Sequence, residues 1–281
     1  GTMVLNAPAK FEKRAGLEAD HRIAFILVPD FSMIAFSSAV ETLRLANRVS
    51  AQPIYGWRCY SPDGQSVKAS NGIVVEVDGS IAELQKAPMV LVCGGVEVQR
   101  FADRAMLDKL RRLAAHGATM GGICTAPYLL AKAGLLDNCR CTIHWENLSG
   151  FQEEFPDIDI TSELFEIDRN RLTCAGGTAA LDMMLTIIAD QCGYGVSVLV
   201  ADMVMHHRIR DGHEGQRMDL RVRLGISNPK LLSVIEIMEN NLESPMSCAD
   251  LAKDVGLSTR QLERLFHKYL KRPPTRYYLG L

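Results

Sequence analysis

The feature that most constrains the fold lies near the end of the chain, where residues 247–270 show the spacing of a helix-turn-helix. Ser247 and Ser258 are good N-cap residues, and each precedes a run of helical periodicity. Gly256 lies between the two runs and supplies the positive φ that a tight turn between helices needs. Leu262 and Phe266 share one face of the second run. This pattern favours a DNA-binding unit over an ordinary helical hairpin with a solvated basic face.

The second helix of this segment presents polar side chains near its N-terminus, which is the part of a recognition helix that reads base edges. Arg and Gln are suited to bidentate contacts with guanine and adenine. Residues 259–281 contain six basic residues and one acidic residue, whereas the whole chain has 31 Lys and Arg against 33 Asp and Glu. Positive charge is therefore concentrated where phosphate contacts are needed. The predicted DNA-binding residues are Ser258, Thr259, Arg260, Gln261, Arg264 and Lys268.

Composition limits what the rest of the chain can be. The 281 residues leave room for two domains, and a hydrophobic content of 47% is typical of domains with well-packed cores. No apolar run reaches the roughly 18 residues that a membrane span needs. The N-terminus has no signal-peptide core, so we expect a cytoplasmic protein without membrane association.

Cysteine usage fits the same compartment. The chain has eight cysteines, several of which lie inside apolar runs, and no Cys-x-x-Cys pair. This pattern is typical of buried free thiols in a reducing environment. A zinc site formed by Cys139, Cys141 and His144 would lack an evident fourth ligand. We therefore predict no bound metal and no cofactor.

Residues 20–211 alternate apolar runs with helical segments. Runs such as residues 22–28 and 89–93 are short and almost wholly apolar, as in parallel strands that are covered on both faces. The alternation predicts an α/β domain with a doubly wound sheet. A polar stretch over residues 212–227 is expected to be a linker. An Asn-Pro pair then begins a small all-α domain over residues 228–281.

A sharp turn after the strand expected at residues 119–123 places Cys124 in a position that resembles a nucleophile elbow. Such a residue lies at the carboxyl edge of the sheet near a helix N-terminus, where the helix dipole and free N–H groups favour a thiolate. Gly95 follows the neighbouring strand and can bring backbone N–H groups to the same crevice. His144 lies twenty residues after Cys124 and can face its thiol.

Several segments carry a resemblance to known families. Residues 20–211 resemble the DJ-1/PfpI group of the class I glutamine amidotransferase-like proteins, which implies a flavodoxin-like sheet. The last fifty or so residues resemble the start of an AraC-type DNA-binding domain. Together they resemble AraC-family regulators with an amidotransferase-like sensor domain. The segments that carry the resemblance are residues 40–47, 122–125, 142–146, 174–182, 260–266 and 274–279.

The resemblance assigns a relic catalytic site to Cys124, Glu41 and His144. In the DJ-1/PfpI group the elbow cysteine lies beside a glutamate from the first helix and a histidine from a following strand. Thr125 stands where PfpI-type proteases have histidine, which argues against peptidase chemistry. Two functions then compete: a non-catalytic effector pocket in a transcriptional regulator, and a hydrolase or glyoxalase-like enzyme that uses Cys124. Thr125 and the fused DNA-binding unit favour the regulator.

The effector implied by the resemblance is a quaternary amine. Residues 140–147 most resemble regulators of glycine betaine catabolism and, next, carnitine regulators. A quaternary ammonium is held by aromatic faces and carboxylates, which Trp145 can supply together with Glu41 or Glu146. An amino acid such as arginine is the alternative effector, and Trp145 is equally typical of a core or interface position. The predicted effector-binding residues are Glu41, Gly95, Cys124, Thr125, His144, Trp145 and Glu146.

AraC-type domains normally hold two helix-turn-helix units joined by a long helix. Residues 273–281 resemble the start of that helix, and no second unit follows. We therefore expect a truncated DNA-binding domain with weak, salt-sensitive binding to double-stranded DNA. Homodimerisation through the sensor domain would compensate in part. The resemblance also implies an activator of genes for small-molecule catabolism.

Overall fold

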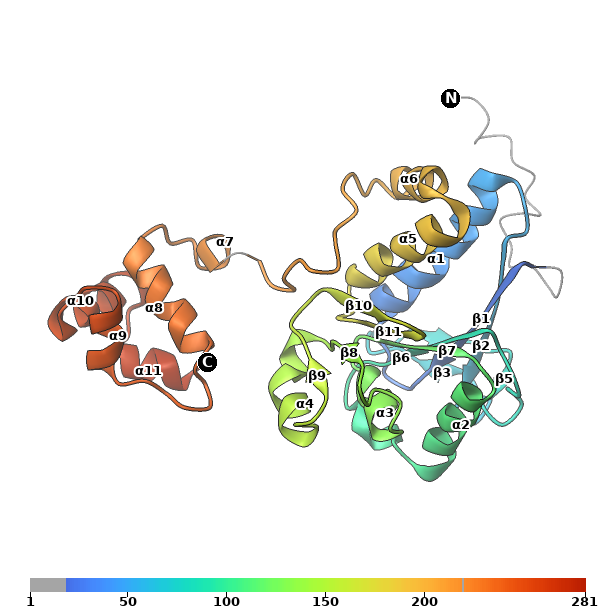
Figure 1. Cartoon of the computed structure of the whole chain (residues 1–281), viewed down its shortest axis with the longest axis horizontal. Coiled ribbons are helices and arrows are strands. Elements are labelled where there is room, and N and C mark those ends of the chain that lie inside the picture. Colours follow the sequence, from blue (N-terminus) through green and yellow to red (C-terminus); the bar gives the residue numbers. More distant parts are fainter. Residues whose placement is uncertain (1–18, 219) are drawn as a thin grey trace. The chain divides into compact units, whose positions relative to one another are not determined.

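The computed structural model describes residues 19–218 and 220–281. Its contacts divide the chain into two compact units, with the boundary between Gln216 and Arg217. The first unit contains a sheet covered by helices, and the second contains helices only (Figure 1). Each unit is described by itself.

The first unit is built on a seven-stranded sheet. Its order is β10-β11-β7-β6-β1-β2-β5, and every neighbouring pair is parallel except β10 with β11. This order confirms the predicted doubly wound α/β sheet. The strands are β1 (His21–Leu27), β2 (Tyr55–Ser61), β5 (Gly79–Ser80), β6 (Met89–Cys93), β7 (Thr119–Ile123), β10 (Phe165–Asp168) and β11 (Arg171–Cys174).

Alternate side chains of each central strand enter two separate cores. In β1, Phe25 and Leu27 pack into one core, whereas Ala24 and Ile26 pack into the other. Both faces of the sheet are therefore buried, which is why the strands read as continuous apolar runs. The first face is covered by α1 (Met33–Ser50), α5 (Ala179–Cys192) and α6 (Tyr194–Met203). The second is covered by α2 (Arg104–Ala115) and α3 (Pro127–Lys132) (Figure 1).

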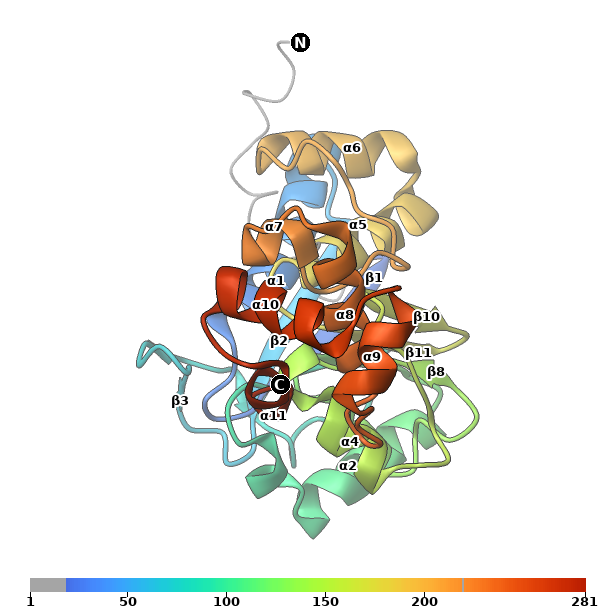
Figure 2. The same ribbon diagram turned by 90° about the vertical axis from the view of Figure 1, so that its left-hand side faces the viewer.

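Several short elements escape the sequence patterns. They are too short to show a period of their own, and long-range contacts hold them in place. The hairpin of β3 (Val67–Lys68) and β4 (Val74–Val75) projects from the first unit (Figure 2). The others are β8 (Arg140–Cys141), β9 (Asp159–Ile160), the 3₁₀ helices η3 (Val98–Phe101) and η4 (Trp145–Asn147), and α4 (Leu148–Glu154).

Two boundaries after α5 differ from the sequence-based prediction. The apolar pattern predicts one helix over residues 196–210, but α6 ends at Met203 and Met205 adopts a left-handed backbone with φ of 58°. The segment expected to be a linker begins on the first unit, where the N–H of Leu164 donates to the Gly212 oxygen at 2.9 Å. It also contains α7 (Leu220–Leu224). Hydrogen bonds within the first unit and packing within the second decide where each unit ends, and composition alone does not show them.

The second unit contains the predicted helix-turn-helix. Ser247 and Ser258 cap the two helices, and Gly256 has φ of 70° in the turn between them, as predicted. Leu262 and Phe266 are fully buried in a core shared with the other helices. The helical spacing of the apolar residues from Leu231 onward also predicts Leu242 in this core, but Leu242 lies beyond the end of α8 and is 45% exposed. The helices of this unit are α7, whose Leu220 and Leu224 pack against the same core, together with α8 (Pro229–Glu239), α9 (Cys248–Asp254), α10 (Thr259–Leu270) and α11 (Pro274–Leu279) (Figures 1 and 2).

Two expectations from composition can be compared with the structure. All eight cysteines lie in the described part of the chain; they are free, and six of them are buried. Among the described residues, no helix is long and apolar enough to cross a membrane.

Candidate functional site

Cys124 lies on the turn between β7 and α3, at the carboxyl edge of the sheet. Its φ is 66°, a left-handed conformation that a non-glycine residue adopts only under constraint. The constraint comes from close packing around the turn. A Cβ on Gly176 would lie 3.0 Å from the Cys124 Sγ, and one on Gly122 would lie 2.7 Å from the Pro127 nitrogen. The predicted elbow is therefore present, and glycines allow neighbouring backbone to approach it.

The Cys124 thiol is neutral, contrary to the thiolate expected from its position. Burial raises the pKa of Cys124 to about 11, against the opposing effect of the Thr125 N–H. The charge of Glu146 raises this pKa further. The following helix α3 is only six residues long, so its dipole is small. Desolvation therefore outweighs the N–H groups on which the sequence argument relied.

His144 is tied to the elbow through its backbone. Its N–H donates to the Cys124 carbonyl oxygen at 3.0 Å. Its imidazole Nδ1 accepts the N–H of Glu146 at 3.2 Å, and its ring stacks on Trp145 with 5.6 Å between centroids. Burial lowers the pKa of His144, and the charge of Glu146 opposes this shift in part. The structure thus brings His144 beside Cys124 but engages its side chain with residues 145 and 146.

Glu41 does not join this pair. It lies in α1, is about half exposed, and accepts a hydrogen bond from Arg44 Nε at 2.6 Å. Glu41 lies in the middle of α1, whereas the N-terminal end of the helix is held near the site, where the N–H of Ser32 donates to the Gly94 oxygen at 3.0 Å. Glu41 is eight residues further along the helix than Met33, which is about 12 Å. The carboxylate that acts on Cys124 is instead Glu146.

The remaining predicted effector residues divide into a closed interior and an open rim. The hydroxyl of Thr125 is buried and donates to the Gly95 oxygen at 2.7 Å, which closes the crevice beside Cys124. Trp145 is 41% exposed, and Glu146 is exposed beside it. A ligand that reaches this site from solvent therefore meets residues 144–146 first.

An open groove of about 260 Å³ adjoins this rim. Two aromatic rings, Tyr128 and Phe151, line it together with the carboxylates Glu146 and Glu154. The Tyr128 hydroxyl donates to Glu154 Oε1 at 3.0 Å. The sequence does not predict that Tyr128, Phe151 and Glu154 share a groove, because no local pattern indicates that α3 and α4 meet. The other lining residues are Val98, Gln99, Ile143, Asn147 and Gly150.

A second polar cluster, also missed, surrounds Asp182. This carboxylate is fully buried in the first turns of α5, in a segment that is otherwise apolar. It accepts hydrogen bonds from the N–H and Nε of Arg210 at 2.6 and 2.8 Å, and His206 Nε2 lies 2.8 Å from it. An aspartate within an apolar helix was the available signal, since buried carboxylates require partners.

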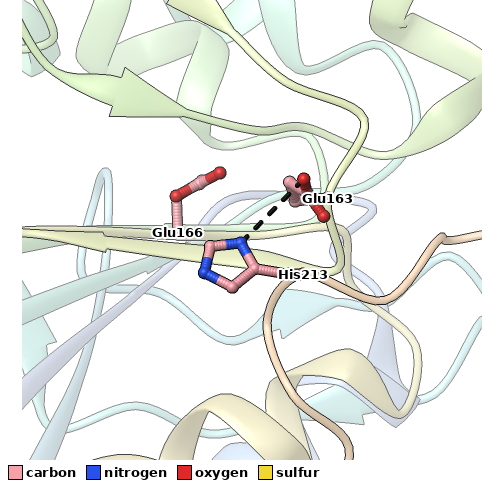
Figure 3. Close-up of side chains that lie close together, drawn as sticks. All are labelled: Glu163, Glu166 and His213. Atoms are coloured by element: carbon pink, nitrogen blue, oxygen red, sulfur yellow. Dashed lines mark ion pairs between the residues drawn. The ribbon is translucent and has the colours of Figure 1, made fainter.

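The residues best placed to hold a metal ion are Glu163, Glu166 and His213, not the cysteines considered from the sequence. One ligand atom from each lies within 4.8 Å of the other two, and Figure 3 shows the three side chains around a common space. Glu166 is buried, and it already accepts hydrogen bonds from Thr161 and Arg140. His213 is mostly exposed, with Nδ1 3.9 Å from Glu163 Oε1. These partners account for the buried carboxylate without a metal ion.

In the second unit, α10 presents the predicted DNA-contacting residues. Thr259, Arg260, Arg264 and Lys268 are exposed along it. Ser258 and Gln261 form a capping box, in which the Gln261 Oε1 accepts the Ser258 N–H at 2.8 Å. The Gln261 amide can therefore make a bidentate contact with adenine only by leaving this cap. The two arginines stay free for such contacts.

Comparison with known proteins agrees with both units. Residues 21–190 match the DJ-1/PfpI family. The chain belongs to this family. The HTH-type transcriptional regulator GbdR of Pseudomonas aeruginosa is 43% identical over 259 residues, covering 92% of this chain and 71% of that protein. The HTH-type transcriptional regulator CdhR of the same species is 45% identical over 257 residues, covering 92% of this chain and 76% of that protein.

A solved structure supports the same assignment. An AraC family transcriptional regulator from Pseudomonas putida has a TM-score of 0.59 and 31% identity, covering 66% of this chain and 99% of that chain. The DJ-1/PfpI fold is here joined to a helix-turn-helix, as the sequence resemblance implied. The chain is therefore a ligand-responsive, AraC-like transcriptional regulator with a DJ-1/PfpI sensor domain.

Proposed function

We propose that the DJ-1/PfpI unit binds a small effector without catalysing a reaction, and that the helix-turn-helix unit carries the response to DNA as a transcriptional activator in the cytoplasm. The observation that carries the non-catalytic role is the state of Cys124. Its thiol is buried with a raised pKa, and the side chains of His144 and Glu41 are engaged elsewhere. A cysteine nucleophile needs a thiolate or an adjacent base.

The effector that fits the exposed rim is a small cation, in particular a quaternary amine such as glycine betaine or carnitine. The negative charge of Glu146 faces a groove that Tyr128 also lines, with Trp145 exposed near its rim. Glu154 lines the groove too, but it is ion-paired with Lys132 at 3.2 Å, so Glu146 is the main source of negative charge. Aromatic rings and carboxylates attract an ammonium group that has no N–H to donate. The groove extends the binding surface expected from residues 144–146 to α3 and α4.

Calorimetric titration tests this proposal. We expect glycine betaine or carnitine to bind the full chain, and Glu146→Gln to weaken binding about tenfold through loss of one charge. Glu76→Gln, an exposed carboxylate outside the groove, is the matched control and should leave affinity within twofold. If neither compound binds at millimolar concentration while arginine does, the quaternary-amine class is wrong.

The enzymatic alternative is tested separately. The full chain would be incubated with glutamine, with peptides and with glyoxals, and product formation would be followed by mass spectrometry. We expect no turnover. Turnover that disappears in Cys124→Ala would overturn the non-catalytic role.

We further propose that the described helix-turn-helix binds double-stranded DNA weakly on its own and that the sensor unit forms a homodimer. One such unit makes few phosphate and base contacts, so its affinity should be low, and the affinity that remains should decrease as salt is added. Dimerisation is supported by the exposed apolar side chains of α6, including Tyr194 at 73% and Leu199 at 43% exposure. Light scattering should give the mass of a dimer, and Tyr194→Asp should shift it toward the monomer.

A further inference from the structure

Residues 204–216, which we call the strap, run from the end of α6 to the last residue of the first unit. The next residue, Arg217, begins the second unit, which holds the helix-turn-helix. The strap has no helix or long strand of its own, yet side chains and backbone fasten it to the first unit at several places. The strap is therefore the part of the first unit that leads directly into the DNA-binding unit.

The first fastening is the buried carboxylate of Asp182. It receives the N–H of Arg210 at 2.6 Å and Nε of Arg210 at 2.8 Å, with His206 on the same side. Arg210 Nη2 also donates to Thr178 Oγ1 at 2.8 Å. Strap residues therefore bind both oxygens of a fully buried carboxylate. Loss of these bonds would leave a buried charge without a partner, which is strongly destabilising.

The last fastening is Gln216, and it is the least satisfied. Its Nε2 lies within 3.0 Å of three acceptors, Thr142 Oγ1, the Ile143 oxygen and the Glu163 oxygen. An amide nitrogen has only two hydrogens to share among them. Its Oε1 is buried and has no hydrogen-bond partner among the described residues. Burial of the unpaired Oε1 is unfavourable in free energy, and release of Gln216 to solvent would remove this unfavourable contribution.

Between these ends, the strap pairs with the strand edge beside β10. The N–H of Leu164 donates to the oxygens of Gly212 and Glu214, and Gly215 forms a bridge with Glu163. His213 points toward Glu163 from this part of the strap (Figure 3).

The partners of both anchors lie close in sequence to residues that contact Cys124. Thr178, the partner of Arg210, follows the glycine loop in which Gly176 packs against Cys124. Ile143, a partner of Gln216, immediately precedes His144, whose N–H binds the Cys124 oxygen. A ligand that shifts His144 or its neighbours therefore disturbs the acceptors of Gln216 directly.

We propose that the strap couples occupancy of the effector site to the DNA-binding unit: effector binding releases the Gln216 anchor, while Asp182 remains the fixed pivot. This inference rests on the proposed function, because it assumes that an effector binds beside residues 144–146. Coupling between two sites is reciprocal. If effector binding opposes the Gln216 anchor, removal of that anchor must strengthen effector binding.

The decisive comparison is Gln216→Ala against Gln85→Ala in the full chain. Gln85 is an exposed glutamine that bonds only within its own turn, to the Ala82 oxygen. We expect glycine betaine to bind Gln216→Ala three- to tenfold more tightly than the unsubstituted chain, with Gln85→Ala unchanged. A purely structural role for Gln216 predicts unchanged or weaker binding, and that result would overturn the coupling.

Two measurements without effector decide the inference even if glycine betaine proves to be the wrong ligand. Trypsin cleavage after Arg217, followed by mass spectrometry, reports release of the strap, and alkylation of Cys124 by iodoacetamide reports loosening of the site. In Gln216→Ala both rates should rise at least threefold over those of Gln85→Ala. If cleavage becomes faster while the Cys124 rate stays the same, the strap is not coupled to the site and the inference fails. Absence of glycine betaine binding alone would refute the effector and not the strap.

Discussion

Cys124 and Gly256 have nearly the same φ angle, but the two turns are held in different ways. Their φ angles are 66° and 70°. Around Cys124 the constraint comes from segments far away in sequence, since Gly176 packs against it from the loop after β11. Around Gly256 the flanking caps Ser247 and Ser258 define the helix ends locally, and a Cβ added at Gly256 would have only the end of the Lys230 side chain within 4 Å. A left-handed residue can thus be imposed by tertiary packing or chosen by local chemistry.

The largest expected effect is at the packed turn. Gly176→Val places a branched side chain against Cys124 at φ of 88°, so we expect loss of about 3 kcal/mol or more of unfolding free energy. Chemical denaturation measures this loss. Gly177→Ala in the same loop, with nothing within 4 Å of its Cβ, is the control and should cost about 1 kcal/mol. Equal losses would show that backbone strain, and not packing on Cys124, dominates.

The second effect is chemical and concerns Cys124 itself. With its pKa raised to about 11 from the usual 9.0, the thiol stays protonated until high pH. At pH 7 its thiolate population should be about a hundredfold below that of an ordinary thiol. The rate of alkylation, followed by peptide mass spectrometry, should rise about tenfold per pH unit up to pH 10. A plateau below pH 9 would mean that the elbow does activate the cysteine, and would revive the enzymatic alternative.

At the second turn we expect a smaller loss. Gly256→Ala requires an L-residue at φ of 70° but meets only a flexible lysine end at 3.9 Å. The loss of unfolding free energy should be about 1–2 kcal/mol, from backbone strain alone. A loss as large as that of Gly176→Val would show that the helix-turn-helix is also held by packing at its turn.

The smallest stability effect is expected at the cap of α10. Ser258→Ala removes the acceptor for the Gln261 N–H, which lies 3.1 Å away, and should cost about 1 kcal/mol. The reciprocal bond, from the Ser258 backbone N–H to Gln261 Oε1, does not involve the hydroxyl and is kept. Ser233→Ala, an exposed serine within α8 that is not a cap, is the matched control and should have little effect. No difference between the two variants would mean that the cap does not define the start of α10.

Local patterns were sufficient for the helix-turn-helix and for the sheet. Buried runs such as those of β1 and β6 have no polar alternation because helices cover both faces, and this shows directly in the sequence. The caps of α9 and α10 are single residues with a local role, so they too can be read without the fold. The predicted helix boundaries are wrong where long-range contacts interrupt a helical pattern. Asp182, for example, binds His206 and Arg210, which lie beyond the end of α6.

The candidate site was only partly predictable. The elbow and His144 were found because a strand-to-helix turn and a family motif mark them. Glu41 was assigned to the site only by the family resemblance. It lies in the middle of α1, about two turns from the end of the helix near Cys124. Tyr128 and Glu154 remained hidden because the meeting of α3 with α4 is a product of the fold. Gln216 was assigned to the linker, although its amide is bonded within the first unit.

By itself, the sequence determined the class of the protein: an α/β sensor unit followed by a helix-turn-helix, with its strands, caps and elbow in place. These depend on the hydrophobic period and on single-residue backbone preferences, which act over a few positions. Only the tertiary structure decided that Cys124 is neutral, that the charged rim is built by Glu146 and Glu154, and that the strap is fastened to Asp182. Protonation and hydrogen-bond partners depend on burial and on neighbours from distant segments, and neither is encoded at the position concerned.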